Sequence, residues 1–280
     1  MKLQLLVPVI TYQVQTEDTA RLTDNVAGIA KYLDADIHAL VLVPDFPPVS
    51  TALGNLLLDV PAMVREVKVN CRARARAMLQ EIERGFAGHQ LQVRTTEAEC
   101  FQPEFGSIAS VHARYHDLTV LDVGSAASAP GTAESLIFGS GKPTLLVSDK
   151  VEKIDFDHVM IAWDGTRAAA RAVADAGLFL ERADRVTIVT VTEDKQLPLD
   201  NLNARLADYF SRRGLTAQAV TLGGGLQVPI ERLLQDKAKE IGAGLLVMGG
   251  FGHSRMRDFV LGGATNGILK NLEMPVLLSH

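Results

Sequence analysis

Residues 244–280 read GLLVMGGFGHSRMRDFVLGGATNGILKNLEMPVLLSH, and this stretch decides the fold. The apolar run Leu245 to Met248 predicts a buried strand, and the glycine-dense segment Gly249-Gly250-Phe251-Gly252 follows it. A second glycine pair, Gly262-Gly263, precedes a helical stretch, and Pro275 opens a last strand. Glycine lets the backbone approach a ligand closely, so this pattern suits an oligophosphate held by N–H donors and a helix dipole. The alternative is a glycine-rich turn between a strand and a helix that binds nothing.

The bulk composition is that of an ordinary globular protein. The chain has 280 residues, of which 47% are hydrophobic and 22% charged, so one or two domains are expected. The net charge of −5 provides no basic footprint for nucleic acid, and no apolar run reaches the length that spans a bilayer. Cys71 and Cys100 lack metal-ligand spacing. We therefore expect a cytoplasmic protein with two reduced, structural thiols.

The chain contains an internal repeat. Leu3 to Val9 resembles His158 to Asp164, and an Ala-rich helical stretch follows each of them. Further matches, in the same order in both halves, pair His38–Val43 with Val186–Val191, Asp117–Asp122 with Gly244–Gly249, and Lys142–Ser148 with Met274–Ser279. Short apolar strands alternate with helical segments, which predicts parallel sheets wrapped by helices. We predict two domains, 1–149 and 150–280, joined by the polar segment Asp149 to Asp157.

The glycine spacing resembles the ATP-binding signature of universal stress proteins, which is G-x-x-G, nine residues, then G with Ser or Thr. Gly249, Gly252 and Gly262 fit that spacing. The flanking Met248 and the closing Pro275-Val276-Leu277-Leu278 also resemble the family's sequences at these places. Gly263 stands where the family usually has Ser or Thr, so a hydroxyl donor is missing there. The backbone N–H remains, and Thr265 is close in sequence.

The resemblance implies an α/β fold of two tandem Rossmann-like (adenine nucleotide alpha hydrolase-like) domains, each a five-stranded parallel sheet flanked by helices. It implies that the second copy binds ATP, with Mg²⁺ or Mn²⁺, and serves stress-response regulation. It also allows a homodimer paired through final strands, without nucleic-acid or membrane partners. The nucleotide-binding residues so implied are Ala162, Asp164, Val191, Met248, Gly249, Gly252, Gly262, Gly263, Ala264 and Thr265.

Two roles are open for Asp164, ligand contact and helix capping. Its carboxylate can accept hydrogen bonds from ribose hydroxyls or help hold a divalent metal. It can instead cap the helix that starts at Thr166. The first copy has Val9 at the matching place, and it has also lost its glycines. Loss of both features together favours ligand contact. For Ala162 and Met248, core packing is the equal alternative to lining the base.

The first copy is predicted to be degenerate. Asp122 stands where the second copy has Gly249, and a carboxylate there would repel phosphate. Ala126 to Gly131 is predicted as loop. Phe138-Gly139-Ser140 resembles Leu261-Gly262-Gly263, but Lys142-Pro143 follows almost at once, so the helix that should start there is predicted to be absent. Extra sequence from Pro44 to Ala62 is predicted to start irregularly, with a short helix at Leu53 to Leu58, and to serve packing or a partner contact.

No catalytic set emerges from the sequence, so an enzyme role would be slow ATP hydrolysis or nucleotidyl transfer on the same fold. A third alternative is an interaction module without ligand. His253, Ser254, Arg255 and Arg257 could grip phosphate or be solvated loop residues. His112 and His116 are four apart on a predicted helix, which makes a weak metal site, and a solvated or partner-facing pair is the preferred interpretation.

Overall fold

The fold is a single ten-stranded sheet covered by helices on both faces. A computed structural model describes residues 2–11, 16–46, 59–124, 129–151, 154–192, 201–223, 228–250 and 263–280. The strands lie in the order β3-β2-β1-β4-β5-β10-β9-β6-β7-β8. They are β1 (Leu3–Ile10), β2 (Ala35–Asp45), β3 (Val93–Phe101), β4 (Leu118–Asp122), β5 (Thr144–Val147), β6 (His158–Ala162), β7 (Arg185–Thr192), β8 (Ala217–Gly223), β9 (Leu245–Gly249) and β10 (Val276–Ser279).

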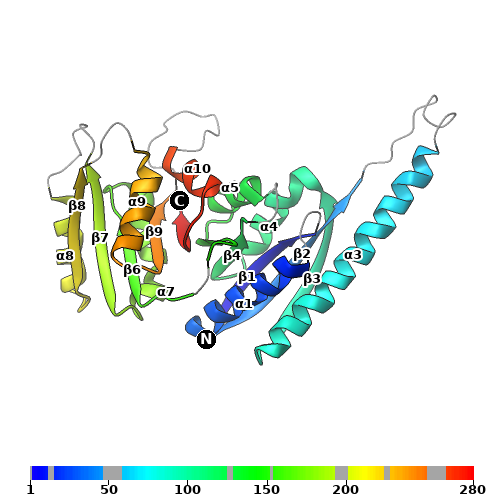
Figure 1. Ribbon diagram of the computed structural model, residues 1–280, viewed down its shortest axis with the longest axis horizontal. Helices are drawn as coiled ribbons and strands as arrows, with labels where there is room; N and C mark the ends of the chain where they lie inside the picture. The colour runs from blue at the N-terminus through cyan, green and yellow to red at the C-terminus, as the bar shows by residue number, and fades with distance from the viewer. Residues whose placement is uncertain are drawn as a thin grey trace.

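The two halves of the sheet repeat one topology and meet at their final strands. The strand order 3-2-1-4-5 of the first half recurs as 8-7-6-9-10 in the second, as the sequence repeat predicts. β5 and β10 pair antiparallel, with Leu145 opposite Leu277, whereas the other neighbouring strands run parallel. Figure 1 shows the halves side by side around this junction. The carboxyl ends of the two halves' strands therefore lie at opposite ends of the sheet.

Helices cover both faces of the sheet because its strands are apolar on both sides. One face is covered by α1 (Thr16–Leu33), α3 (Val60–Gly88), α6 (Arg167–Asp175), α7 (Gly177–Leu180) and α8 (Leu202–Ser211). The other is covered by α4 (Phe105–Ala113), α5 (Ala129–Gly139), α9 (Ile230–Glu240) and α10 (Gly263–Lys270). A short 3₁₀ helix, η1 (Gln102–Glu104), precedes α4. Cys71 packs against the first face and Cys100 lies in the second, and both thiols are free.

An aromatic cluster joins the halves on the first face. Tyr32 of α1 packs edge-on against Phe156, with ring centroids 5.2 Å apart. Phe156 lies edge-on to Phe179 of α7 at 5.0 Å. Phe156 belongs to the connecting segment that was predicted as polar, yet it is fully buried. The connection is thus packed into the core between the halves.

The strand register corrects one sequence match by one residue. The backbone N–H of Asp117 donates to Gln4, and that of the equivalent Gly244 donates to His158. Gln4 therefore corresponds to His158, which makes Ile10, and not Val9, the counterpart of Asp164. The correction leaves an apolar residue at that place in the first half.

The prediction of a missing helix in the first half is wrong. α5 begins at Ala129, inside the stretch predicted as loop, and it occupies the position before β5 that α10 occupies before β10. Matching Gly139 to Gly262 misplaced the helix, because Gly139 ends α5 and does not precede it. The first half therefore has a complete set of elements.

The extra sequence of the first half is more regular at its ends than predicted. β2 continues through Pro44 to Asp45, and α3 begins at Val60, with Pro61 in its first turn. The predicted short helix at 53–58 lies outside the described residues. The first fully buried side chain of α3 is Ala75, and Figure 1 shows the start of this helix extending past the sheet.

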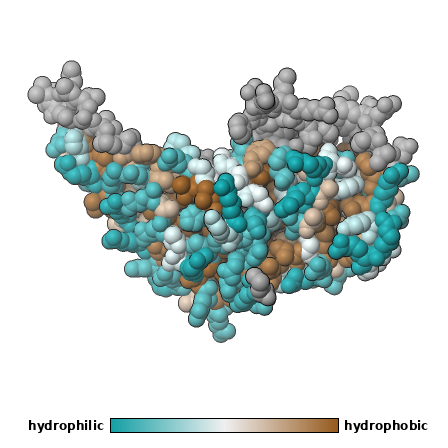
Figure 2. All heavy atoms as spheres, turned by 180° about the vertical axis from the view of Figure 1, so that it is seen from behind, coloured by the Kyte–Doolittle hydropathy of each residue, from teal (hydrophilic) through white to brown (hydrophobic). Residues whose placement is uncertain are grey.

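Hydrophilic side chains cover most of the face seen in Figure 2, with apolar atoms showing between them. Large exposed apolar side chains on the described part of the chain are spread over several elements, for example Val69 on α3 and Tyr115 after α4. Within the described ranges, no helix combines the length and the apolar character needed to cross a membrane.

His116 is buried rather than solvated, which corrects the sequence interpretation. It follows the end of α4, and its Nε2 lies 2.9 Å from Nδ1 of His38 on β2. Its Nδ1 lies 2.8 Å from the carbonyl oxygen of His112, so that nitrogen carries the proton. The guanidinium of Arg94 on β3 lies 3.0 Å from His38 Nδ1, and Thr96 Oγ1 lies 2.9 Å from His38 Nε2.

This cluster holds its histidines neutral. Burial, and then the positive charge of Arg94, lower the pKa of His38 from 6.5 to about 4. Burial also lowers the pKa of His116. A neutral buried histidine must be charged when the chain unfolds in acid, so these groups make stability depend on pH.

We predict that the protein loses stability as the pH falls from 6.5 toward about 4. His38 has the lower pKa when folded, so the unfolded chain binds more protons, and the stabilisation present above pH 6.5 is lost on acidification. Between about pH 7.5 and about pH 5, His38 alone accounts for on the order of 2 kcal/mol. Urea unfolding followed by circular dichroism at both pH values measures this loss.

The variant His38→Gln should show a smaller loss of unfolding free energy over that pH range. The matched control is His89→Gln, which changes a histidine that bonds to Asp24 outside the buried cluster. An equal pH dependence in wild type and His38→Gln would contradict the prediction.

Candidate functional site

The predicted site residues of the second half lie at one edge of the sheet. β6, β7 and β9 run parallel and end at this edge. The register places Ala162 beside Met248 on one side and beside Val189 on the other, so Val191 also lies near this end. Ligands of doubly wound sheets bind at the carboxyl ends of their strands. The arrangement thus brings Ala162, Asp164, Val191, Met248 and Gly249 to a position where ligands bind in such folds.

A tight turn after β6 positions Asp164. Its Oδ1 accepts a hydrogen bond of 2.9 Å from the backbone N–H of Thr166. Gly165 between them has a φ of +75°, which favours glycine. Thr166 is the N-cap of α6, since its Oγ1 accepts from the N–H of Ala169 at 3.2 Å. The capping role considered for Asp164 therefore belongs to Thr166, and one oxygen of the half-buried Asp164 carboxylate accepts a hydrogen bond within the turn.

Gly249 has a packing reason to be glycine. A Cβ at this position would lie 2.5 Å from the backbone nitrogen of Ala169 and 2.6 Å from the carbonyl carbon of Ala168. The first turn of α6 therefore needs the space at Gly249, whether or not a ligand approaches. The sequence pattern alone could not separate this packing role from a binding role.

The backbone of Gly250 is already engaged. Its N–H donates to the carbonyl of Ser279 at 2.7 Å, and its own carbonyl lies 3.0 Å from Nδ1 of His280. A Cβ at Gly250 would lie 2.9 Å from Cγ2 of Ile137, a side chain of α5. Gly250 is therefore held on several sides and has no N–H left for an anion.

The first turn of α10 offers the described amides that are suited to an anion. The first N–H groups of a helix have no partner within it, and they lie at the positive end of its dipole. Gly263 is exposed, and a Cβ there would meet no atom of the described residues within 4 Å. Thr265 is 2% exposed, so its side chain is not presented at the surface near Gly263.

Several predicted residues lie outside the described part of the chain. These are Gly252 and Gly262 of the predicted signature and the polar residues His253, Ser254, Arg255 and Arg257. In the ranges that the structure describes, no three His, Cys, Asp or Glu residues form a group able to hold a metal ion.

The corresponding edge of the first half carries an ion pair. Asp122 faces Val147 in the register as Gly249 faces Ser279, so the two positions correspond, as predicted. One Asp122 oxygen accepts from the N–H of Gly124 at 2.8 Å, and the other lies 3.3 Å from the guanidinium of Arg21. The sequence analysis missed Arg21, because a single cation on α1 carries no signal of its own.

Comparisons with known proteins agree with the fold. The sequence pattern of the universal stress protein family matches residues 155–280. The universal stress protein Slr1230 from Synechocystis sp. is 30% identical over 146 residues, which span 51% of this chain and about half (49%) of that relative.

Two solved structures share the fold over nearly the whole chain. A universal stress protein from Archaeoglobus fulgidus DSM 4304 superposes with a TM-score of 0.70 and 16% identity, over 99% of this chain and 97% of its own. Protein PA1789 from Pseudomonas aeruginosa PAO1 superposes with a TM-score of 0.53 and 15% identity, over 98% of this chain and 92% of its own.

An experiment can distinguish a glycine required for packing, Gly249, from the exposed Gly263. We predict that Gly249→Ala lowers the free energy of unfolding by about 2 kcal/mol, because the new methyl group collides with the backbone of α6. Gly263→Ala should change it by less than about 0.5 kcal/mol, because its surroundings are open. Chemical denaturation measures both values, and equal effects of the two variants would show that the packing assignment is wrong.

Proposed function

Residues 155–280 form a universal stress protein domain, which makes the chain a member of that family, and from this premise we propose that its second half binds ATP. The proposed binding domain spans residues 150–280. The nucleotide lies at the edge where β6, β7 and β9 end, and Mg²⁺ or Mn²⁺ accompanies its phosphates. The observation that carries this proposal is the exposed Gly263, at the start of α10 and at the same end of the sheet as Asp164, where a Cβ would meet no atom of the described residues within 4 Å.

The proposed contacts follow from the chemistry of each group. The exposed amides at Gly263 and Ala264 receive phosphate oxygens, together with Gly252 and Gly262. Asp164 has one oxygen in its turn, and a carboxylate can accept further bonds, so it receives ribose hydroxyls or a metal-bound water. The partly buried Ala162 and Val191 provide the apolar surface for the base, and Met248, which is 6% exposed, supports that surface from the core. Thr265 contributes its backbone N–H, because its side chain is buried.

The first half, residues 1–149, is proposed to bind no nucleotide. Asp122 places a carboxylate where the second half has Gly249, and Arg21 neutralises it. A phosphate chain at this edge would have to displace the ion pair and approach a negative charge. Repulsion between like charges within a few ångströms costs far more there than a single hydrogen bond returns.

We propose a regulatory role in which the protein reports nucleotide binding in the cytoplasm during stress, without rapid turnover. No catalytic set emerges from the sequence, so we propose binding and not catalysis. The final strands, through which a homodimer was expected to pair, already pair within the chain. A homodimer would therefore use another surface.

Two substitutions at one position test the binding site. Gly263→Asp should preserve folding, since a carboxylate in the first turn of a helix is favourable, but it should weaken ATP binding by about a hundredfold through repulsion of phosphate. Gly263→Ser restores the hydroxyl that the family signature has, and it should bind at least as tightly as wild type. Isothermal titration calorimetry with ATP and Mg²⁺ measures both.

The same titrations distinguish ATP binding from the alternative functions. If wild type shows no heat of binding, the remaining alternative is an interaction module without ligand. If Gly263→Asp binds ATP with the same affinity as wild type, the binding site is not at Gly263. Phosphate release from ATP that is rapid in wild type and absent in Asp164→Ala would establish an enzyme instead of a binding protein.

A further inference from the structure

The first half touches the beginning of the second half's glycine segment. Gly250 is buried, and Ile137 of α5 fills the space that a side chain at Gly250 would need. The antiparallel pairing of β5 and β10 explains this contact. Because the two strands run in opposite directions, the end of α5, which leads into β5, lies beside the end of β10.

His280 connects α5 to the backbone of Gly250. Its Nδ1 lies 3.0 Å from the carbonyl oxygen of Gly250, which only accepts, so this nitrogen carries the donated proton. The ring of His280 packs edge-on against Phe138 of α5, with centroids 4.9 Å apart and an interplanar angle of 74°. Phe138 thus fixes the orientation of the ring that holds Gly250.

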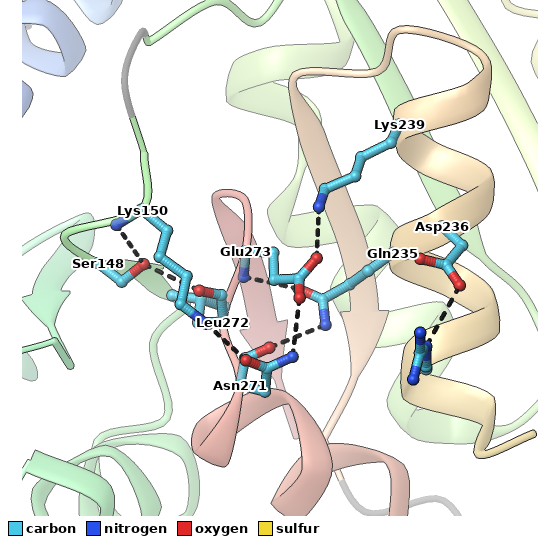
Figure 3. Close-up of polar contacts among 9 residues, drawn as sticks. Ser148, Lys150, Gln235, Asp236, Lys239, Asn271, Leu272 and Glu273 are labelled. Carbon is cyan, nitrogen blue, oxygen red and sulfur yellow. Dashed lines mark hydrogen bonds and ion pairs between the residues drawn. The ribbon is translucent and has the colours of Figure 1, made fainter.

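The end of the first half and the start of the connecting segment also hold the far end of α10. Figure 3 shows Ser148 and Lys150, which follow β5, reaching the turn that connects α10 to β10. Ser148 Oγ donates to the carbonyl of Leu272 at 3.0 Å and is buried, and Lys150 Nζ donates to Oδ1 of Asn271 at 2.5 Å.

Helix α9 holds the same turn from the second half. Gln235 Nε2 donates to the Asn271 carbonyl at 2.9 Å, and Gln235 Oε1 accepts from the N–H of Glu273 at 2.8 Å. Lys239 pairs with the Glu273 carboxylate (Figure 3). The turn after α10 is therefore fixed from both halves, and with it the direction of the helix.

We propose that the first half is the positioning partner of the second half's nucleotide site, with Phe138 as its main positioning residue. This inference rests on the proposed function and adds its regulation. Gly250 and α10 flank residues 251–262, which carry the remaining signature glycines, and the first half holds both flanks. Amides that are held in place before binding lose less conformational freedom when a phosphate arrives, which raises affinity. By linkage, a nucleotide must tighten these contacts in return.

Phe138→Ala should speed hydrogen exchange of the Gly250 amide, which bonds to Ser279, in the protein without nucleotide. It should also weaken ATP binding by about tenfold, the size of a typical coupling between sites. Fluorescence of Trp163, the one tryptophan of the sequence and the neighbour of Asp164, follows the titration. His280→Ala should have the same two effects.

Tyr32→Ala is the matched control. Tyr32 also joins the halves through an aromatic contact, with Phe156, but it does so on the opposite face of the sheet. This variant should lower the melting temperature and leave both Gly250 exchange and ATP affinity within about twofold of wild type. A purely structural role for Phe138 would make the two variants behave alike.

The outcomes separate the two proposals. If wild type binds no ATP, the proposed function fails, and faster Gly250 exchange in Phe138→Ala but not in Tyr32→Ala would still support positioning by the first half. If Gly250 exchange in Phe138→Ala equals that in Tyr32→Ala, or if ATP binds Phe138→Ala as tightly as wild type, the inference is overturned.

Discussion

The antiparallel pairing of β5 with β10 is the interaction on which the rest of the structure depends. Each half alone would be a five-stranded parallel sheet whose final strand exposed unpaired N–H and C=O groups. Pairing the two final strands, with Leu145 opposite Leu277, gives hydrogen-bond partners to the N–H and C=O groups of both strands and buries them. The same pairing sends the carboxyl ends of the two halves in opposite directions. It also brings α5 to Gly250 and Ser148 to the turn after α10, so that each half supports the end of the other.

Much of this fold could be predicted from the sequence, because alternating apolar strands and helical segments fix an α/β architecture. The register could not, because the apolar residues Val9 and Ile10 at the end of β1 fit the match equally well. Only the hydrogen bonds of Asp117 and Gly244 decide that Ile10 corresponds to Asp164. The helix α5 was missed because Gly139 resembles the glycine before α10, although it lies at the opposite end of its helix.

The candidate site shows the same limit. Glycine spacing indicated one edge of the sheet as the candidate site, but it could not tell why each glycine is there. Gly249 makes room for α6 and Gly250 makes room for Ile137, whereas a side chain at Gly263 would meet none of the described residues. The contacts of Arg21, Phe138 and His280 leave no trace in local sequence, because each depends on a partner far along the chain.

The approximate two-fold axis at Leu145 and Leu277 has a consequence for how the halves can change. In a symmetric pair of separate chains, every substitution appears twice, once on each side of the axis. Here a single polypeptide contains both sides, so a residue can be replaced at one end and kept at the other. Asp122 and Gly249 illustrate this freedom, since they occupy corresponding positions and one is a carboxylate whereas the other has no side chain. Joining two copies in one chain thus allows one of them to specialise as a support while the other retains an open surface.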